Sequence, residues 1–341
     1  MDPVLFKVIL CLAVFAITLG IAAYSTWGER KVAAILQDRI GPDRAGKFGI
    51  LQPLADGLKM FMKEEFIPAQ ANKWLFILGP SFFMFTAFMT GVVIPWGGSV
   101  TINGESYPLQ IADINVGLLY LLAVVSVGVY GIMIGGWASN NKYSLMGALR
   151  ASSQMISYEI SMGLALIGLV MWTGTLSLGE IAAQQDAGYA NVVYQPLGFL
   201  IFIICAFAET NRAPFDLPES EAELIGGFHT EYSSMKLGLY LFAEYINMFI
   251  SSAVLATLYF GGYNFPFQHA LGLGDWLPIV QVIVMFLKVF GFILFFMWVR
   301  WTLPRFRYDQ LMNLGWKVML PLALANIFIT GLVMYFTGKL G

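Results

Sequence analysis

Long apolar runs alternate with short polar segments along almost the whole chain. A helix needs roughly 20 residues to cross a hydrocarbon core ~30 Å thick, and eight of the runs are of about that length. The runs lie at 4–27, 74–95, 114–138, 151–175, 192–208, 237–260, 277–299 and 316–337, and the fifth is the shortest. The pattern therefore predicts an all-α polytopic membrane protein, with eight transmembrane helices in a single membrane domain over residues 1–341.

The segment 47–66 has a different pattern. Its apolar residues recur at helical spacing, with polar residues off the stripe, and they are Leu51, Leu54, Leu58 and Phe61. A helix of this length and charge is expected to lie in the membrane interface rather than to span the bilayer. Two interpretations are open: a simple surface anchor, or one wall of an opening that faces the lipid.

The composition agrees with a membrane protein and argues against cofactors. Charged residues make up 12% of the chain, against about 25% in soluble domains, and the mean hydropathy is +0.71. Cys11 and Cys205 both lie in apolar runs, and His229 and His269 have no spacing typical of metal or haem ligation. No dinucleotide or P-loop motif is present. We therefore expect no metal, no catalytic residue and no bound cofactor in this chain, and no nucleic-acid partner; redox chemistry would belong to partner subunits.

Lys and Arg predict the orientation. Most of the 19 cations lie in four alternate loops, at 28–73, 139–150, 209–236 and 300–315. The loops between them hold none, and these are 96–113, 180–191 and 261–276. The positive-inside rule places the basic loops in the cytoplasm or an organelle matrix, and both termini on the periplasmic or intermembrane side. The membrane would be a bacterial cytoplasmic (inner) membrane or a mitochondrial inner membrane.

One basic-side loop, 209–236, is also strongly acidic. Its carboxylates are Glu209, Asp216, Glu219, Glu221, Glu223 and Glu231. Pro214 and Pro218 interrupt any helix, and a short helix can restart at Pro218. A solvated acidic loop would fit this charge, but it would not fit the apolar residues interleaved with it. The sequence therefore predicts a folded, partly buried element.

Five ionisable residues lie inside or at the edges of the apolar runs: Glu159, Glu209, Glu244, Lys288 and Lys317. Each costs about 2.5–3.5 kcal/mol at a helix centre on insertion scales, so each calls for a reason. We expect all five to approach from the basic side. They could pair to fix helix packing, or form a proton relay, since buried carboxylates can exchange protons near neutral pH.

Three tyrosines adjoin carboxylates in the sequence: Tyr158, Tyr232 and Tyr245. They could bridge hydrogen bonds along such a relay. For any one of them an ordinary interfacial tyrosine is the simpler interpretation.

Four stretches together resemble one family: GERKVAAILQDRIGPDRAGKFGILQPLADGLKMFMKEE, SSQMISYEISMGLAL, AETNRAPFDLPESEAELIGGFHTEYSSMK and LPRFRYDQLMNLGWK. They are similar to the H-subunit family of proton-pumping NADH:quinone oxidoreductase, respiratory complex I. The resemblance covers essentially the whole chain. It implies a membrane subunit at the junction with the redox arm, with flavin and iron–sulfur clusters on partner subunits and quinone as substrate.

The resemblance also implies site residues. A quinone channel would start between the first span, the interfacial helix and the sixth span. The matching residues are Glu29, Arg30 and Arg39, with Arg300, Arg305 and Arg307 along the same side. The acidic residues that match the family's proton path are Glu159, Glu209, Asp216, Glu219, Glu221, Glu223, Glu231 and Glu244, with Lys288 and Lys317 as possible counter-charges.

The expected function is thus a membrane component that forms the quinone channel and couples quinone reduction to proton translocation. Its partners would be the other membrane and redox-arm subunits, quinone and the lipid bilayer. Two alternatives are an equivalent component of a membrane-bound hydrogenase or other quinone-linked complex, and a standalone proton-coupled carrier. Flavin and iron–sulfur clusters in the copurified complex would exclude the carrier, and NADH oxidation would exclude the hydrogenase.

Overall fold

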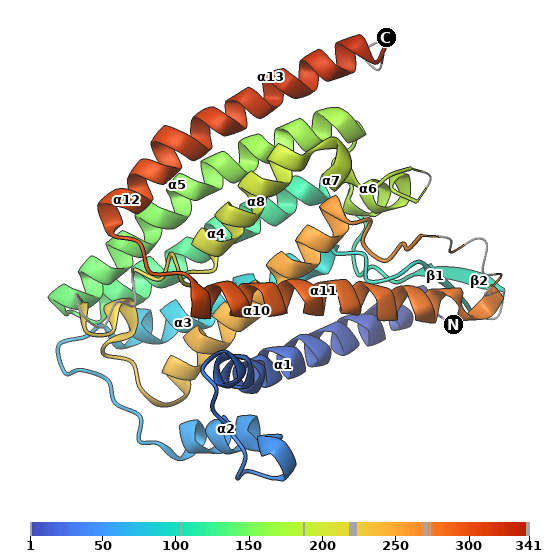
Figure 1. Ribbon diagram of the computed structural model, residues 1–341. Helices are drawn as coiled ribbons and strands as arrows, with labels where there is room; N and C mark the ends of the chain where they lie inside the picture. The colour runs from blue at the N-terminus through green and yellow to red at the C-terminus, as the bar shows by residue number, and fades with distance from the viewer. Residues whose placement is uncertain are drawn as a thin grey trace.

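The computed structural model describes residues 2–102, 104–186, 188–217, 224–266, 268, 272 and 274–338. Helices dominate it (Figure 1). Seven are long and apolar enough to span a bilayer: α1 (Pro3–Leu36), α3 (Lys73–Thr90, continued by the 3-10 turn Gly91–Val93), α4 (Gly117–Ala138), α5 (Lys142–Thr173), α10 (Ser234–Tyr259), α11 (Leu277–Thr302) and the C-terminal helix Tyr308–Phe336. The chain is therefore an all-α polytopic membrane protein, as predicted.

The fifth predicted span, 192–208, corresponds to the shorter α8 (Pro196–Glu209). Its 14 residues extend about 21 Å at 1.5 Å per residue, less than the thickness of a hydrocarbon core. The short helices α6 (Leu178–Gln184) and α7 (Asn191–Tyr194) precede it. Each predicted apolar run thus contains a helix, but this one is too short to span a bilayer on its own.

The two ends of the bundle differ. Both termini, α6, α7 and a hairpin of β1 (Ser99–Ile102) and β2 (Glu105–Pro108) lie at one end, which we call the outer end (Figure 1). The helix α2 (Gln52–Met62) and the start of α12 (Tyr308–Asn313) lie at the opposite, inner end. The hairpin was not predicted, because strands of four residues are too short to show a clear alternation of apolar and polar residues.

Three helices extend beyond their apolar runs at the inner end. α1 continues to Leu36 rather than residue 27, α5 begins at Lys142 rather than 151, and the last helix begins at Tyr308 rather than 316. Asn141 caps α5 by accepting from the amide of Tyr143 at 2.9 Å. Hydropathy marks only the part of a helix in lipid, so it missed these polar turns. As a result Glu29 lies on a helix and not in a loop.

The C-terminal helix is not uniform. A π-helical segment, η5 (Leu314–Met319), joins α12 to α13 (Leu320–Phe336). Such segments shift the face that the following residues present, and they occur often at functional sites.

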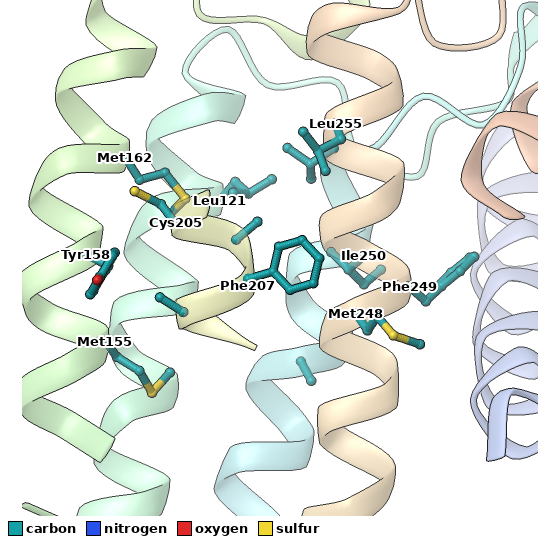
Figure 2. Packing of buried hydrophobic residues seen from close by; sticks show 14 of the residues in the cluster. Leu121, Met155, Tyr158, Met162, Cys205, Phe207, Met248, Phe249, Ile250 and Leu255 are labelled. Carbon is teal, nitrogen blue, oxygen red and sulfur yellow. The ribbon is translucent and has the colours of Figure 1, made fainter. Parts of the chain in front are cut away.

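Close helix packing builds the core. Figure 2 shows Met162 of α5 beside Cys205 of α8, and Ile250 and Leu255 of α10 on the side of Phe207 of α8, whereas Phe249 lies on the opposite side of α10. At the α4–α10 contact, the hydroxyl of Tyr240 donates to the carbonyl oxygen of Gly131 at 3.1 Å. A Cβ atom at Gly135 would overlap that hydroxyl, so only glycine fits there.

The inner loops are packed where the structure describes them. Phe215, Leu217, Leu224 and Phe228 in loop 209–236 are almost fully buried, although Ile225 is exposed. The short helix predicted to start at Pro218, with Glu219, Glu221 and Glu223, lies outside the described residues. In the predicted amphipathic segment 47–66 the helix covers only Gln52–Met62, preceded by a 3-10 turn, Lys47–Gly49.

Candidate functional site

A buried carboxylate, Glu29, organises the inner end of α1. Its Oε2 lies 2.8 Å from Nη1 of Arg212, and its Oε1 lies 2.5 Å from Nη1 of Arg300. The hydroxyl of Tyr245 donates to the same Oε2 at 2.8 Å. Only 4% of Glu29 is exposed. One acid is therefore held by two guanidinium groups and a phenol, from α1, loop 209–236, α10 and α11.

Arg212 links this carboxylate to a second one. Its guanidinium carbon lies 4.1 Å from the centre of the Tyr245 ring, within cation–π range. Burial favours loss of the Arg212 proton, but the neighbouring Tyr245, Glu29 and Glu244 outweigh burial and raise its pKa above the usual value. Arg212 therefore stays charged between Glu29 and Glu244, which is itself buried on α10.

A cavity of about 330 Å³ lies against Glu29. α1, α2, α10 and α11 all line it, and its polar lining includes Arg30, Asp56, Tyr245 and Arg300. Its apolar lining includes Ala23, Pro53, Leu241, Phe242 and Trp301. Apolar walls with a few convergent polar groups are typical of sites for small organic ligands.

The helix α2 lines this cavity with residues outside its apolar stripe, which are Pro53, Asp56, Gly57, Lys59 and Met60. Asp56 forms an ion pair of 2.8 Å with Arg30 and accepts from the side-chain amide of Gln52 at 3.1 Å. The opposite face carries the apolar stripe, and all of its members are exposed: Leu51, Leu54, Leu58 and Phe61. None of the residues of α2 is buried. The chain alone leaves the stripe uncovered, as an interfacial helix requires.

The remaining predicted channel arginines lie elsewhere. Arg39 is exposed and its Nε donates to Gln37 at 2.8 Å, next in sequence to the end of α1. Arg305 forms an ion pair of 3.0 Å with Asp216, and Arg307 pairs with Asp309 on the surface at 2.7 Å. Of the six predicted residues, Glu29, Arg30 and Arg300 line the cavity, whereas these three do not.

Two of the predicted path carboxylates, both half-buried, interact electrostatically with each other. Glu159 on α5 accepts a hydrogen bond from the hydroxyl of Ser126, and it interacts electrostatically with Glu209 at the end of α8. Glu209 lines a small internal cavity with Asn247, Thr86 and Thr90. These polar side chains could hold a proton or a water next to the carboxylate.

The other predicted carboxylates occupy separate positions. Asp216 is buried beside Arg305. Glu231 accepts from the amide of Asn141 at 2.5 Å and lines an inner-end cavity of about 700 Å³ with Lys142. Glu219, Glu221 and Glu223 lie outside the described residues.

The two predicted counter-charges differ from expectation in their surroundings. Lys317 is exposed on the π-helical segment. Lys288 donates to the backbone carbonyl oxygens of Phe260, Gly262 and Asn264, and among the described residues it forms no ion pair. Since those carbonyls follow the outer end of α10, Lys288 does not approach from the inner side.

The sequence did not single out Arg212 as a site residue, and it offered Tyr245 only as one of three possible hydrogen-bond bridges. Tyr245 bonds to Glu29, which is 216 residues away in sequence, although the neighbouring Glu244 had suggested it as a bridge. Tyr158 and Tyr232 instead donate to backbone carbonyls, and burial raises the pKa of Tyr232 to about 12. Arg212 had one available signal, as a cation beside Glu209 in the quoted AETNR stretch. No group of three His, Cys, Asp or Glu side chains suited to a metal occurs among the described residues.

The fold and site define a polytopic helical membrane protein with a charged cavity at the inner end. The family model described as NADH dehydrogenase matches residues 8–331. An H subunit of NADH-quinone oxidoreductase from Cytophaga hutchinsonii is 69% identical over 326 residues, which is 95% of each chain. The H subunit from Flavobacterium psychrophilum is 63% identical over 332 residues, or 96% of each chain. The chain therefore belongs to the H-subunit family of NADH-quinone oxidoreductase, respiratory complex I.

This membership makes the chain one component of a multisubunit enzyme complex. A relative from a more distant bacterium, Geobacter metallireducens, is 49% identical over 338 residues, which is 98% of this chain and 99% of its own. The seven long apolar helices agree with a multi-pass membrane protein.

Proposed function

We propose that this chain forms the quinone access and binding cavity of the complex and couples quinone reduction to proton translocation. The observation that carries the proposal is the cavity against Glu29, which joins an apolar lining to the half-buried Arg300 and to Tyr245, while Arg212 binds the same Glu29 carboxylate. The names of the relatives include quinone and NADH, which favours this interpretation over a hydrogenase component or a standalone carrier.

The cavity fits the chemistry of a quinone head group. Reduction takes two electrons and two protons per quinone, and the charge that develops lies on the carbonyl oxygens. Arginine remains ionised and can donate to such an oxygen throughout the reaction. At about 330 Å³ the cavity is near the lower limit of ligand pockets, so it suits a head group more than a long tail. The exposed stripe of α2 would leave the tail in lipid.

The electrons would come from partner subunits, because flavin and iron–sulfur clusters are expected there. This chain's own residues would bind the ring, orient it and hold charge. When negative charge develops at the cavity, Arg300 and Arg212 are drawn towards it and away from Glu29. Movement of Arg212 towards the cavity would take its charge away from Glu244, and so raise the proton affinity of that buried acid.

Glu159 and Glu209 would continue this coupling inside the bundle. Two nearby carboxylates repel when both are ionised, so one of them tends to retain a proton. A change of charge at Glu244 would move that proton between them and the inner loops. The packing interpretation predicts instead that neutral substitutes at these positions leave proton translocation unchanged.

The inner loops would form the surface on which the redox arm docks. Most of the cations lie on this side, together with the packed loop 209–236 and the cavity lined by Glu231 and Lys142. The positive-inside rule then places the inner end in the cytoplasm and both termini in the periplasm of a bacterial host. The relatives named above are bacterial, which favours the bacterial over the mitochondrial membrane.

Photolabelling tests the proposed cavity. A quinone carrying a photoreactive group on its ring should label α1, α2, α10 or α11 at the cavity, and excess unmodified quinone should suppress the labelling. Peptide mapping by mass spectrometry locates the product. Labelling confined to the β1–β2 hairpin and the other outer loops would reject the proposed cavity.

A further inference from the structure

Lys288 carries a fixed charge at the outer end of α10. Its Nζ lies 2.7 Å from the carbonyl oxygen of Phe260, 2.8 Å from that of Gly262 and 2.6 Å from that of Asn264. An ammonium group has three N–H donors, and all three are used here. A neutral amine has only two, so the three contacts favour the protonated form. The C-terminal end of a helix is negative, which favours a cation at this position.

The backbone is shaped to surround this ammonium group. Gly261 and Gly262 have φ values of 74° and 56°, which glycine tolerates and other residues rarely adopt. The chain therefore curls back so that alternate carbonyl groups converge on Nζ. The arrangement resembles a coordination shell of carbonyl oxygens, with a tethered ammonium in place of a free cation.

Side-chain amides fix the same turn from the other side. Oε1 of Gln185 accepts from the amide of Gly261 at 2.9 Å, while its Nε2 donates to the carbonyl of Thr257 at 3.0 Å. The side-chain amide of Asn264 donates to the carbonyl of Ala182 at 2.8 Å. The turn is thus held between the α6 region and α11, and its polar groups are already paired.

The ionisable groups in the inner half of the bundle differ from Lys288 in their chemistry. Glu159 and Glu209 are carboxylates beside polar side chains or a small cavity, and they can exchange protons. Lys288 offers an ammonium group held by three carbonyl oxygens and forms no ion pair within the described part of the chain. A positive charge inside a spanning segment repels protons and other cations, as fixed cations do in selective pores.

We propose that Lys288 closes the outer end of this chain as a built-in cation, so that the buried carboxylates exchange protons only with the inner side. The proposal rests on the proposed function in one respect, since it takes those carboxylates as proton carriers. The closure itself is a passive property, and it can be measured without turnover.

The test compares passive proton flux through vesicles that contain the assembled complex, without NADH or quinone. A pH gradient is imposed, potassium and valinomycin clamp the potential, and an internal dye reports the pH. Lys288→Gln keeps two N–H donors but removes the charge, so proton flux should rise several-fold over wild type. Lys288→Arg keeps the charge and should stay as tight as wild type.

Lys317→Gln is the matched control, because it removes a lysine from a spanning helix where the side chain is exposed. It should not leak. Gly262→Ala keeps Lys288 but strains the carbonyl turn, since its φ of 56° disfavours a side chain, and it should leak in the same direction as Lys288→Gln.

Wild-type tightness in assembled Lys288→Gln and Gly262→Ala complexes would overturn the proposal. Proton leakage through Lys317→Gln equal to that through Lys288→Gln would also overturn the proposal, because the loss of any lysine charge would then cause a leak. The two proposals can also fail separately. If the Lys288→Gln complex leaks protons but the Glu209→Gln complex pumps normally, the closure by Lys288 stands and the carboxylate relay is rejected.

Discussion

Arg212 and Glu29 are 183 residues apart in sequence, yet they form an ion pair of 2.8 Å with side chains only 4% and 6% exposed. Removing one partner of a buried pair leaves an uncompensated charge and costs about 3–5 kcal/mol. The pair therefore ties loop 209–236 to the end of α1, and the same guanidinium also interacts electrostatically with the buried Glu244.

Arg212→Met should destabilise the assembled complex by about 3–5 kcal/mol, because Glu29 then keeps only Arg300 and Tyr245. Thermal dissociation in detergent measures this. Arg307→Met is the control, since its pair with Asp309 is exposed and should contribute about 0–1 kcal/mol. Glu29→Gln added to Arg212→Met should recover part of the loss. Equal stability of the two single variants would contradict a structural role for the buried pair.

Tyr245→Phe should impair quinone reduction while the complex stays assembled. The ring remains under Arg212, but the hydrogen bond to the Glu29 carboxylate, worth about 1.5–3 kcal/mol, is lost. NADH oxidation by a hydrophilic artificial acceptor should be unchanged, because that acceptor bypasses the cavity. Tyr232→Phe removes a hydroxyl bonded to backbone carbonyls and should affect only stability. Identical quinone kinetics in the two variants would remove Tyr245 from the site.

Glu209→Gln separates proton relay from packing, because glutamine keeps the shape but cannot exchange a proton. The relay predicts an assembled complex in which proton translocation and NADH:quinone turnover fall together. Glu209→Asp should be less impaired, since it retains the carboxylate. Reconstituted vesicles and native gels give the three readouts. Glu180→Gln, at an exposed outer carboxylate, is the control. Full pumping by an assembled Glu209→Gln complex would return that residue to a packing role.

The stripe of α2 should contact lipid rather than water. A nitroxide attached at Leu58→Cys should be relaxed strongly by oxygen and weakly by a water-soluble nickel chelate. The same label at Lys63→Cys, just beyond the end of the helix, should show the reverse order. Folding of the bundle should not change, because no residue of α2 is buried. Strong nickel access at both positions would place the helix in water.

The sequence predicted the features that depend on local pattern and missed those that depend on contacts between distant segments. Apolar runs located the helices, because a bilayer demands long uninterrupted apolar segments. The inner turns of α1 and α5 were missed because polar helical residues outside lipid have no hydropathy signal. The residues around the cavity come from four distant segments, and periodicity says nothing about which of them meet. The resemblance supplied Glu29 and Arg300, and the sequence offered Tyr245 as a hydrogen-bond bridge, but the partner of Tyr245 and the position of Arg212 required the structure.

Lys288 shows a second limit of prediction from sequence. Its depth along α11 suggested a counter-charge for carboxylates, because a side chain twelve residues before Arg300 lies deep in the apolar run. Depth alone does not say which way a long, flexible side chain points. The two glycines that follow α10 were a usable signal, since adjacent glycines after a helix often expose carbonyl groups in a turn.

The contact between Gly135 and Tyr240 constrains how these two positions can change during evolution. As long as position 240 is tyrosine, Gly135→Ala should prevent assembly, because the added methyl group overlaps the tyrosine hydroxyl. Phenylalanine at position 240 removes that hydroxyl, so Tyr240→Phe should act as a second-site suppressor of Gly135→Ala. A genetic selection for respiratory growth, started from Gly135→Ala, should recover it. In descendants of this gene, a side chain at position 135 is thus expected only where position 240 has already lost its hydroxyl.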